Sequence, residues 1–131
     1  MPLEVQVVSP ERILWSGEAD MVITRTLGGG EIAFLAGHAP FVGALGIGVT
    51  RIRPAGGDDI AVAVHGGFVE VSDNQVSILS DVAELPGDID VNRAEQAKAK
   101  AEEALRQEQD AETEAALRRA HVRLEAAGGM G

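Results

Sequence analysis

The chain has 131 residues and a formal net charge of −10, which fits one ordinary domain or one small domain with an appendage. The acidic balance argues against direct binding to nucleic acid or anionic lipid, because both rely on a basic surface. The sequence has no cysteine, and no apolar run approaches the roughly 20 residues that span a bilayer. We therefore expect a protein without disulfides, nucleic-acid partners or direct membrane insertion.

The first two thirds of the chain have a period of two, as expected for strands with one buried face. Residues 3–7 alternate Leu and Val with Glu and Gln, and β-branched runs recur at residues 60–64, 68–71 and 76–79. Clusters of Gly, Pro, Ser and Asn separate these runs. The pattern predicts an N-terminal domain over residues 1–87 with seven or more short strands, arranged as an all-β sandwich or barrel of antiparallel sheets.

Residues 88–131 predict a C-terminal α-helical hairpin. Asp88 or Asp90 is placed to cap a first helix, and no Gly or Pro follows until Gly128. The polar stretch at residues 107–110 is the predicted turn between two helices. Gly128-Gly129 is predicted to end the second helix.

Both predicted helices carry weak apolar stripes. The stripes are formed by Ala94, Ala97, Ala101, Ala104 and Leu105 on the first helix, and by Leu117, Ala120, Leu124 and Ala127 on the second. Each buried methyl group contributes only about 1 kcal/mol, so the packed hairpin is expected to be marginally stable. The turn has Asp110 as a possible cap but no Gly or Pro, so nothing local prevents the tail from straightening into one helix.

Basic side chains stand at both ends of the tail. Folding the helices back about residues 107–110 places Arg93 opposite Arg123, and Lys100 near Arg119. Four cations at one end would repel each other, and a polyphosphate would relieve that repulsion. The alternative is that they are solvated helix charges balanced by neighbouring glutamates. Likewise, Ile89 and Asp90 offer an apolar contact and a carboxylate for a base edge, but Asp90 also serves as a plain helix cap.

The sequence shows no catalytic or metal-binding constellation. Gly28-Gly29-Gly30-Glu31 lacks the Lys and Ser or Thr of a phosphate loop and predicts a hairpin turn. His38, His65 and His121 are scattered, without a second ligand at metal-site spacing. No serine occupies a nucleophile elbow. We therefore predict a non-catalytic protein without a metal.

One loop suggests a contact with a partner protein. Gly37-His38-Ala39-Pro40-Phe41 joins a tight turn to an apolar, glycine-rich run. Such a run is either a partner-binding patch or a core strand, and composition alone does not separate the two.

The chain resembles the epsilon subunit of bacterial F-type ATP synthases over essentially its full length. Each motif is weak alone, but their order and spacing make the resemblance specific. The motifs are Val5-x-Val7-Val8-Ser9-Pro10, Trp15-Ser16-Gly17, Gly30-Glu31-Ile32, Gly37-His38-Ala39-Pro40, Gly66-Gly67-Phe68-Val69-Glu70-Val71 and Ile89-Asp90-x-x-Arg93-Ala94.

The resemblance implies a β-sandwich of two five-stranded sheets followed by a regulatory hairpin. It implies a rotor subunit in the central stalk, peripheral on the cytoplasmic face of the bacterial membrane, which contacts the gamma subunit and the c-ring and couples rotation to proton flow. ATP acts as a regulatory ligand rather than a cofactor: it keeps the hairpin folded, and without ATP the helices extend into the alpha/beta catalytic head and inhibit hydrolysis.

The resemblance also assigns the ATP contacts. They fall on Glu84, Ile89, Asp90, Arg93, Lys100, Arg119 and Arg123. Lys100 stands where well-characterised ATP binders have Arg; it keeps the charge but loses the guanidinium fork. The family includes members whose hairpin responds feebly to ATP, so a purely structural coupling clamp is the alternative function.

Overall fold

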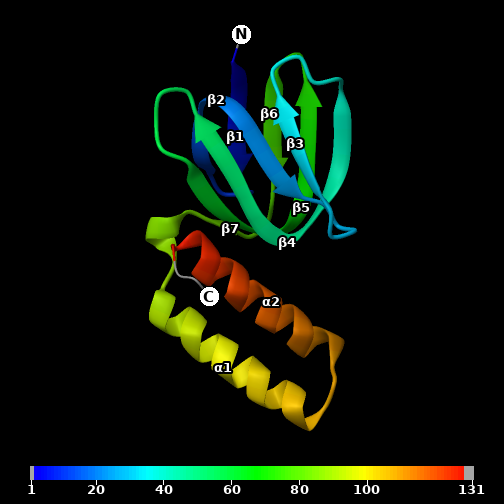
Figure 1. Cartoon of the computed structure of the whole chain (residues 1–131), viewed down its shortest axis with the longest axis vertical. Helices are drawn as coiled ribbons and strands as arrows, with labels where there is room; N and C mark the ends of the chain where they lie inside the picture. The colour runs from blue at the N-terminus through cyan, green and yellow to red at the C-terminus, as the bar shows by residue number, and fades with distance from the viewer. Residues whose placement is uncertain (1, 129–131) are drawn as a thin grey trace.

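Strands and then helices follow one another along the chain, as the sequence predicts. The computed structural model describes residues 2–128 and is shown in Figure 1. The strands are β1 (Leu3–Val8), β2 (Ile13–Arg25), β3 (Glu31–Leu35), β4 (Phe41–Pro54), β5 (Ile60–Ser72), β6 (Gln75–Leu79) and β7 (Ala83–Glu84). A 3₁₀ turn, η1 (Pro86–Asp88), leads into the helices α1 (Val91–Gln107) and α2 (Ala111–Ala126).

The strands form a β-sandwich that closes on itself. Their order is β1-β6-β5-β4-β2-β3, with β7 paired to β5, and β1 also pairs with β2. The predicted fold class, a β-sandwich followed by a helical hairpin, is confirmed. One detail differs from two separate antiparallel sheets: β1 and β6 are parallel, and the layers are joined in one network. The long strand β2 joins them, since it pairs first with β1 and then with β3 and β4.

The core has the alternation that the period of two predicts. Leu3, Val5 and Val7 of β1 are at most 1% exposed, whereas the residues between them face solvent. Phe34 is the largest fully buried side chain of the core. Burial of these apolar side chains provides the main driving force for folding of the sandwich.

The glycine turn at residues 28–30 is confirmed as the β2–β3 hairpin. The N–H of Thr26 donates to the carbonyl of Gly30 over 2.7 Å, and Gly29 has a φ of 93°. Glycine adopts this backbone conformation without the steric cost that other residues incur.

The hairpin has the predicted caps and turn. The Asp90 carboxylate accepts a hydrogen bond from the N–H of Arg93 at 3.0 Å. Asp110 caps α2 through the N–H of Glu112 at 3.1 Å. The turn lies between Gln107, where α1 ends, and Ala111, where α2 begins, as the sequence predicts.

Helix α2 lies between the sandwich and α1 (Figure 1). Ala120 and Leu124, which belong to its predicted stripe, are buried, and so are Val122 and Ala126 outside that stripe. On α1, Ala94 and Ala101 are buried but Ala97 is exposed, so the predicted apolar face of α1 is too wide. The described part of the chain contains no helix that is long and apolar enough to cross a membrane.

Candidate functional site

Glu84 joins the sandwich to the hairpin. It ends β7, which pairs with β5. Its Oε1 accepts a hydrogen bond from Arg123 Nε of α2 at 2.7 Å, and the Nε2 of His65 in β5 lies 2.9 Å from the same oxygen. One carboxylate therefore holds a strand and a helix that lie far apart in the sequence.

The electrostatics favour an ionised carboxylate. Burial alone would raise the pKa of Glu84, but the hydrogen bonds from Arg123 and His65 lower the pKa below its ordinary value. Since an ionised carboxylate only accepts hydrogen bonds, His65 must donate its Nε2–H.

His65 is almost completely enclosed, with its side chain 3% exposed. Burial lowers the pKa of His65, the hydrogen bond to Glu84 opposes this, and the positive charge of Arg123 lowers it further; the net direction is downward. His65 Nδ1 is buried and has no hydrogen-bond partner in the part of the chain that the structure describes. A neutral ring with its proton on Nε2 therefore fits this environment.

Apolar contacts surround the start of α1. Ile89, 9% exposed, packs in a small cluster with Val49 and Ala63 of the strands and with Val122 and Ala126 of α2. Ile89 thus contacts both the sandwich and the second helix, which fixes the point where the hairpin leaves the sandwich.

The seven predicted ATP contacts are only partly brought together. Glu84 and Arg123 are in direct contact. Arg119 donates to Glu112 of its own helix at 2.9 Å. Arg93 and Lys100 are exposed, and neither forms an ion pair within residues 2–128. Two of the four cations therefore already have carboxylate partners, which reduces the predicted repulsion between them.

Family models cover almost the whole chain. The model described as "ATP synthase, Delta/Epsilon chain, beta-sandwich domain" matches residues 2–86, and "ATP synthase, Delta/Epsilon chain, long alpha-helix domain" matches residues 88–128. The chain belongs to the delta/epsilon chain family of ATP synthases. As a member of the epsilon-chain family it is a non-catalytic subunit, as the sequence predicts.

Relatives named ATP synthase epsilon chain agree with this membership. The protein of Streptomyces coelicolor is 46% identical, with 97% of this chain and 96% of the relative aligned. That of Halalkalibacterium halodurans is 44% identical over 96% and 97% of the two chains, and that of Gloeothece citriformis 39% identical over 99% and 98%.

Solved structures show the same fold. A chain in the Euglena gracilis mitochondrial ATP synthase, in a structure of OSCP, F1 and c-ring, matches with a TM-score of 0.79 and 26% identity, over 96% of this chain and 81% of that one. A chain in the central stalk and c-ring structure from Tetrahymena thermophila has a TM-score of 0.55 and 17% identity, over 67% and 69% of the two chains, and shows the fold alone.

The loop predicted to contact a partner is held to the sandwich of this epsilon-chain family member by a hydrogen bond and by aromatic contacts. The N–H of Gly37 donates to Asn74 Oδ1 at 2.6 Å. The ring of His38 lies 4.9 Å from that of Phe34 and 6.4 Å from that of Phe41. Phe41 packs against the core while Val42 is 69% exposed. The segment is thus both a strand with one buried face and an exposed surface.

Sequence reasoning misses His65, which it considers only as a metal ligand. The available signal is the pair of glycines that follows it: Gly66 and Gly67 have φ angles of 89° and 125°. Their backbone departs from regular strand geometry directly after His65, although β5 continues to Ser72. The pairing of His65 with Glu84 depends on the β5–β7 contact, which the sequence pattern does not reveal.

Proposed function

We propose that the chain is a rotor subunit in the central stalk of a proton-translocating ATP synthase, on the cytoplasmic face of the bacterial membrane. In this role it couples rotation to proton flow, and its hairpin responds to ATP. The docked hairpin binds ATP, whereas the released hairpin reaches the alpha/beta catalytic head and inhibits hydrolysis. The single observation that carries the sensing role is the Glu84–Arg123 contact between sandwich and hairpin.

ATP would act through a population shift. If only the docked hairpin presents Glu84, Ile89 and Arg123 together, ATP binds the docked state better and increases its population. Arg119 and Arg123 offer guanidinium forks to the phosphates, and Lys100 adds a point charge without a fork. In this structure Arg119 pairs with Glu112 and Arg123 pairs with Glu84. Bound ATP would either share the two arginines with these carboxylates or replace the carboxylates as their partner.

The interface between hairpin and sandwich is small enough for such a switch. Its buried apolar contacts are mainly Ile89, Val122 and Ala126 against the strands, and a second ion pair joins Arg51 Nη2 to Glu125 Oε2 at 2.9 Å. Both members of that pair are about half exposed, so the pair contributes little. Few contacts oppose release, which supports a ligand-controlled equilibrium.

An exposed apolar patch on the sandwich supports docking to other stalk subunits. Val42 of β4, Phe68 of β5 and Leu79 of β6 are 69%, 56% and 40% exposed, and Phe68 and Leu79 are directly paired across their strands. Exposed apolar patches of this kind mark protein interfaces. We assign the gamma subunit and the c-ring as partners of the sandwich, with residues 37–41 at the contact.

Isothermal titration of the isolated chain with ATP tests the sensing role. We expect saturable binding that Arg93→Ala weakens about tenfold, as loss of a charge-assisted contact does. Arg106→Ala is the matched control: Arg106 is an exposed arginine of α1 that pairs with Glu103 in the same helix. Absence of heat at millimolar ATP contradicts sensing but leaves the rotor assignment intact.

A static coupling clamp is the alternative function. It is favoured by one observation: Arg119 and Arg123 are already paired with Glu112 and Glu84 without any ligand. Deleting residues 88–131 in the reconstituted synthase separates the two functions. Inhibition by the hairpin predicts a marked rise in ATP hydrolysis, whereas a clamp predicts no change.

A further inference from the structure

A pocket of about 460 Å³ lies between the sandwich and α2. Its volume is in the range typical of small-molecule sites, which often occur between domains. Its apolar walls include Ile47, Leu105 and Leu117. Its charged side chains are Arg25, Arg51, Arg118, Glu31, Glu114 and Glu125. Glu84, His65 and Arg123 do not line it.

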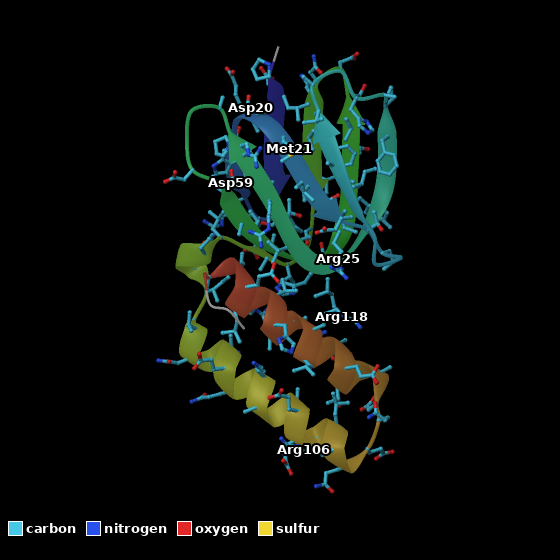
Figure 2. The ribbon with its side chains drawn as sticks, in the orientation of Figure 1. Asp20, Met21, Arg25, Asp59, Arg106 and Arg118 are labelled. Carbon is cyan, nitrogen blue, oxygen red and sulfur yellow. The ribbon has the colours of Figure 1, made fainter. Side chains whose placement is uncertain are left out.

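Two arginines face this pocket from opposite sides. Figure 2 shows Arg25 at the lower edge of the sandwich and Arg118 on the side of α2 that faces it. Neither forms an ion pair within the described residues. Both also line an adjoining hollow of about 400 Å³ beside the β2–β3 turn. Both arginines therefore line both cavities, and neither has an ion-pair partner among residues 2–128.

The position of Arg25 depends on a glycine. A Cβ atom at Gly48 would lie 2.6 Å from Cδ and 2.7 Å from Cβ of Arg25. The stem of Arg25 thus lies directly on the backbone of β4, where only glycine leaves room for it. This packing directs a long flexible side chain along the wall of the pocket.

The charges in the lining limit the kind of ligand. Arg51 Nη2 forms an ion pair with Glu125 Oε2 at 2.9 Å, so these two charges offset each other. Glu31 is the cross-strand neighbour of Arg25, and Glu114 lies one turn before Arg118, but neither glutamate forms an ion pair within residues 2–128. These carboxylates would repel a polyphosphate. A ligand with a single negative charge, placed between the two arginines, and an apolar chain, packed against the apolar walls, fits this lining.

We propose that the Arg25–Arg118 pocket binds a small organic monoanion, a carboxylate with a short apolar chain. The two arginines hold the carboxylate through their forks, and the ligand bridges the sandwich and α2, so its binding stabilises the docked hairpin. The pocket is distinct from the proposed ATP site. Arg123 lies about 140° around α2 from Arg118, at 3.6 residues per turn.

An NMR titration of the full chain with hexanoate tests the proposal. We expect saturable shifts at amides of β4 and α2 that line the pocket. Hexanol has the same chain length without the charge, and inorganic phosphate has negative charge without the apolar chain. Both are expected to bind at least about tenfold more weakly than hexanoate, because hexanol cannot pair with the arginines and phosphate cannot fill the apolar walls.

Variants locate the site. Arg118→Gln changes an exposed residue and should weaken hexanoate binding about tenfold; Arg25→Gln should do the same. Arg106→Gln, at the far end of α1 (Figure 2), is the control and should bind normally. Shifts that do not saturate, equal binding of hexanol or phosphate, or normal binding by both pocket variants would overturn the proposal. The hexanoate titration contains no ATP, so its outcome does not depend on ATP sensing.

Discussion

Replacing Arg123 by Gln should release the hairpin from the sandwich. The substitution removes the 2.7 Å hydrogen bond from Arg123 Nε to Glu84 Oε1. It also leaves the Glu84 carboxylate with His65 as its remaining partner. The distance and the partial burial of both groups make this the strongest polar contact between hairpin and sandwich.

The size of the effect follows from burial. A hydrogen bond between charged groups stabilises by about 1.5 to 3 kcal/mol. The side chains of Arg123 and Glu84 are 30% and 25% exposed, so solvent screening places the effect near the lower end, at about 1.5 kcal/mol. That value corresponds to an approximately tenfold rise in the ratio of released to docked hairpin.

Spin labels can measure this ratio directly. The sequence has no cysteine, so cysteines introduced at the exposed positions Asp58 and Gln109 carry the only two labels. Double electron–electron resonance without ATP should show the ratio of released to docked hairpin rising about tenfold in Arg123→Gln. Arg51→Gln, which breaks the more exposed pair with Glu125, should have a smaller effect. Arg106→Gln should have none, and equal docked populations in Arg123→Gln and Arg106→Gln would refute this reasoning.

Three further predictions concern His65, Gly67 and Asp90. The pKa of His65 is lowered from 6.5 by burial and by the positive charges of Arg123 and Arg119 on α2. Release of the hairpin removes those two charges, so the released state binds the proton better. Docking should therefore be most stable above pH 6.5 and weaken as the pH falls below it, and His65→Gln should flatten this dependence in the label distances. Gly67→Ala should lower the melting temperature strongly and reduce the free energy of unfolding by more than about 3 kcal/mol. The reason is that the added Cβ would lie 2.1 Å from the Leu79 carbonyl oxygen, at a backbone φ of 125°. Gly28→Ala is the control and should be nearly neutral in the same thermal melts, because a Cβ at Gly28 would have no heavy atom within 4 Å outside its own residue and its chain neighbours. Asp90→Ala should reduce helicity by circular dichroism and cost about 1 kcal/mol, since Asp90 caps α1; an unchanged spectrum and stability would contradict this.

Local chemistry makes much of the fold predictable from the sequence. The alternation in residues 3–7 gives the buried face of β1, and the caps at Asp90 and Asp110 give the starts of both helices. These features depend on neighbours within a few residues, so one sequence is enough to reveal them.

Long-range pairing is what the sequence does not reveal. The parallel contact of β1 with β6 joins segments about 70 residues apart. The second buried face of α2, at Val122 and Ala126, arises because α2 lies between two partners; periodicity identifies a stripe but not what covers it.

The residues of the candidate site likewise include some that the sequence suggests and some that only the long-range packing reveals. Glu84 and Arg123 are suggested by the resemblance to a family, and the structure brings them into contact. His65 depends on the β5–β7 pairing. The Arg25–Arg118 pocket depends on how α2 sits against the sandwich, which no local pattern encodes.

The distance between labels at Glu95 and Arg118, measured in the reconstituted synthase with and without Mg²⁺ and ATP, tests the central claim most directly. With ATP the helices should pack side by side, at about 8–10 Å between their axes. Without ATP, a continuous helix would separate the two labelled positions by about 35 Å, at 1.5 Å per residue. A shift from the short to the long distance on removal of ATP is the predicted result. The same short distance in both conditions would contradict an ATP-controlled hairpin.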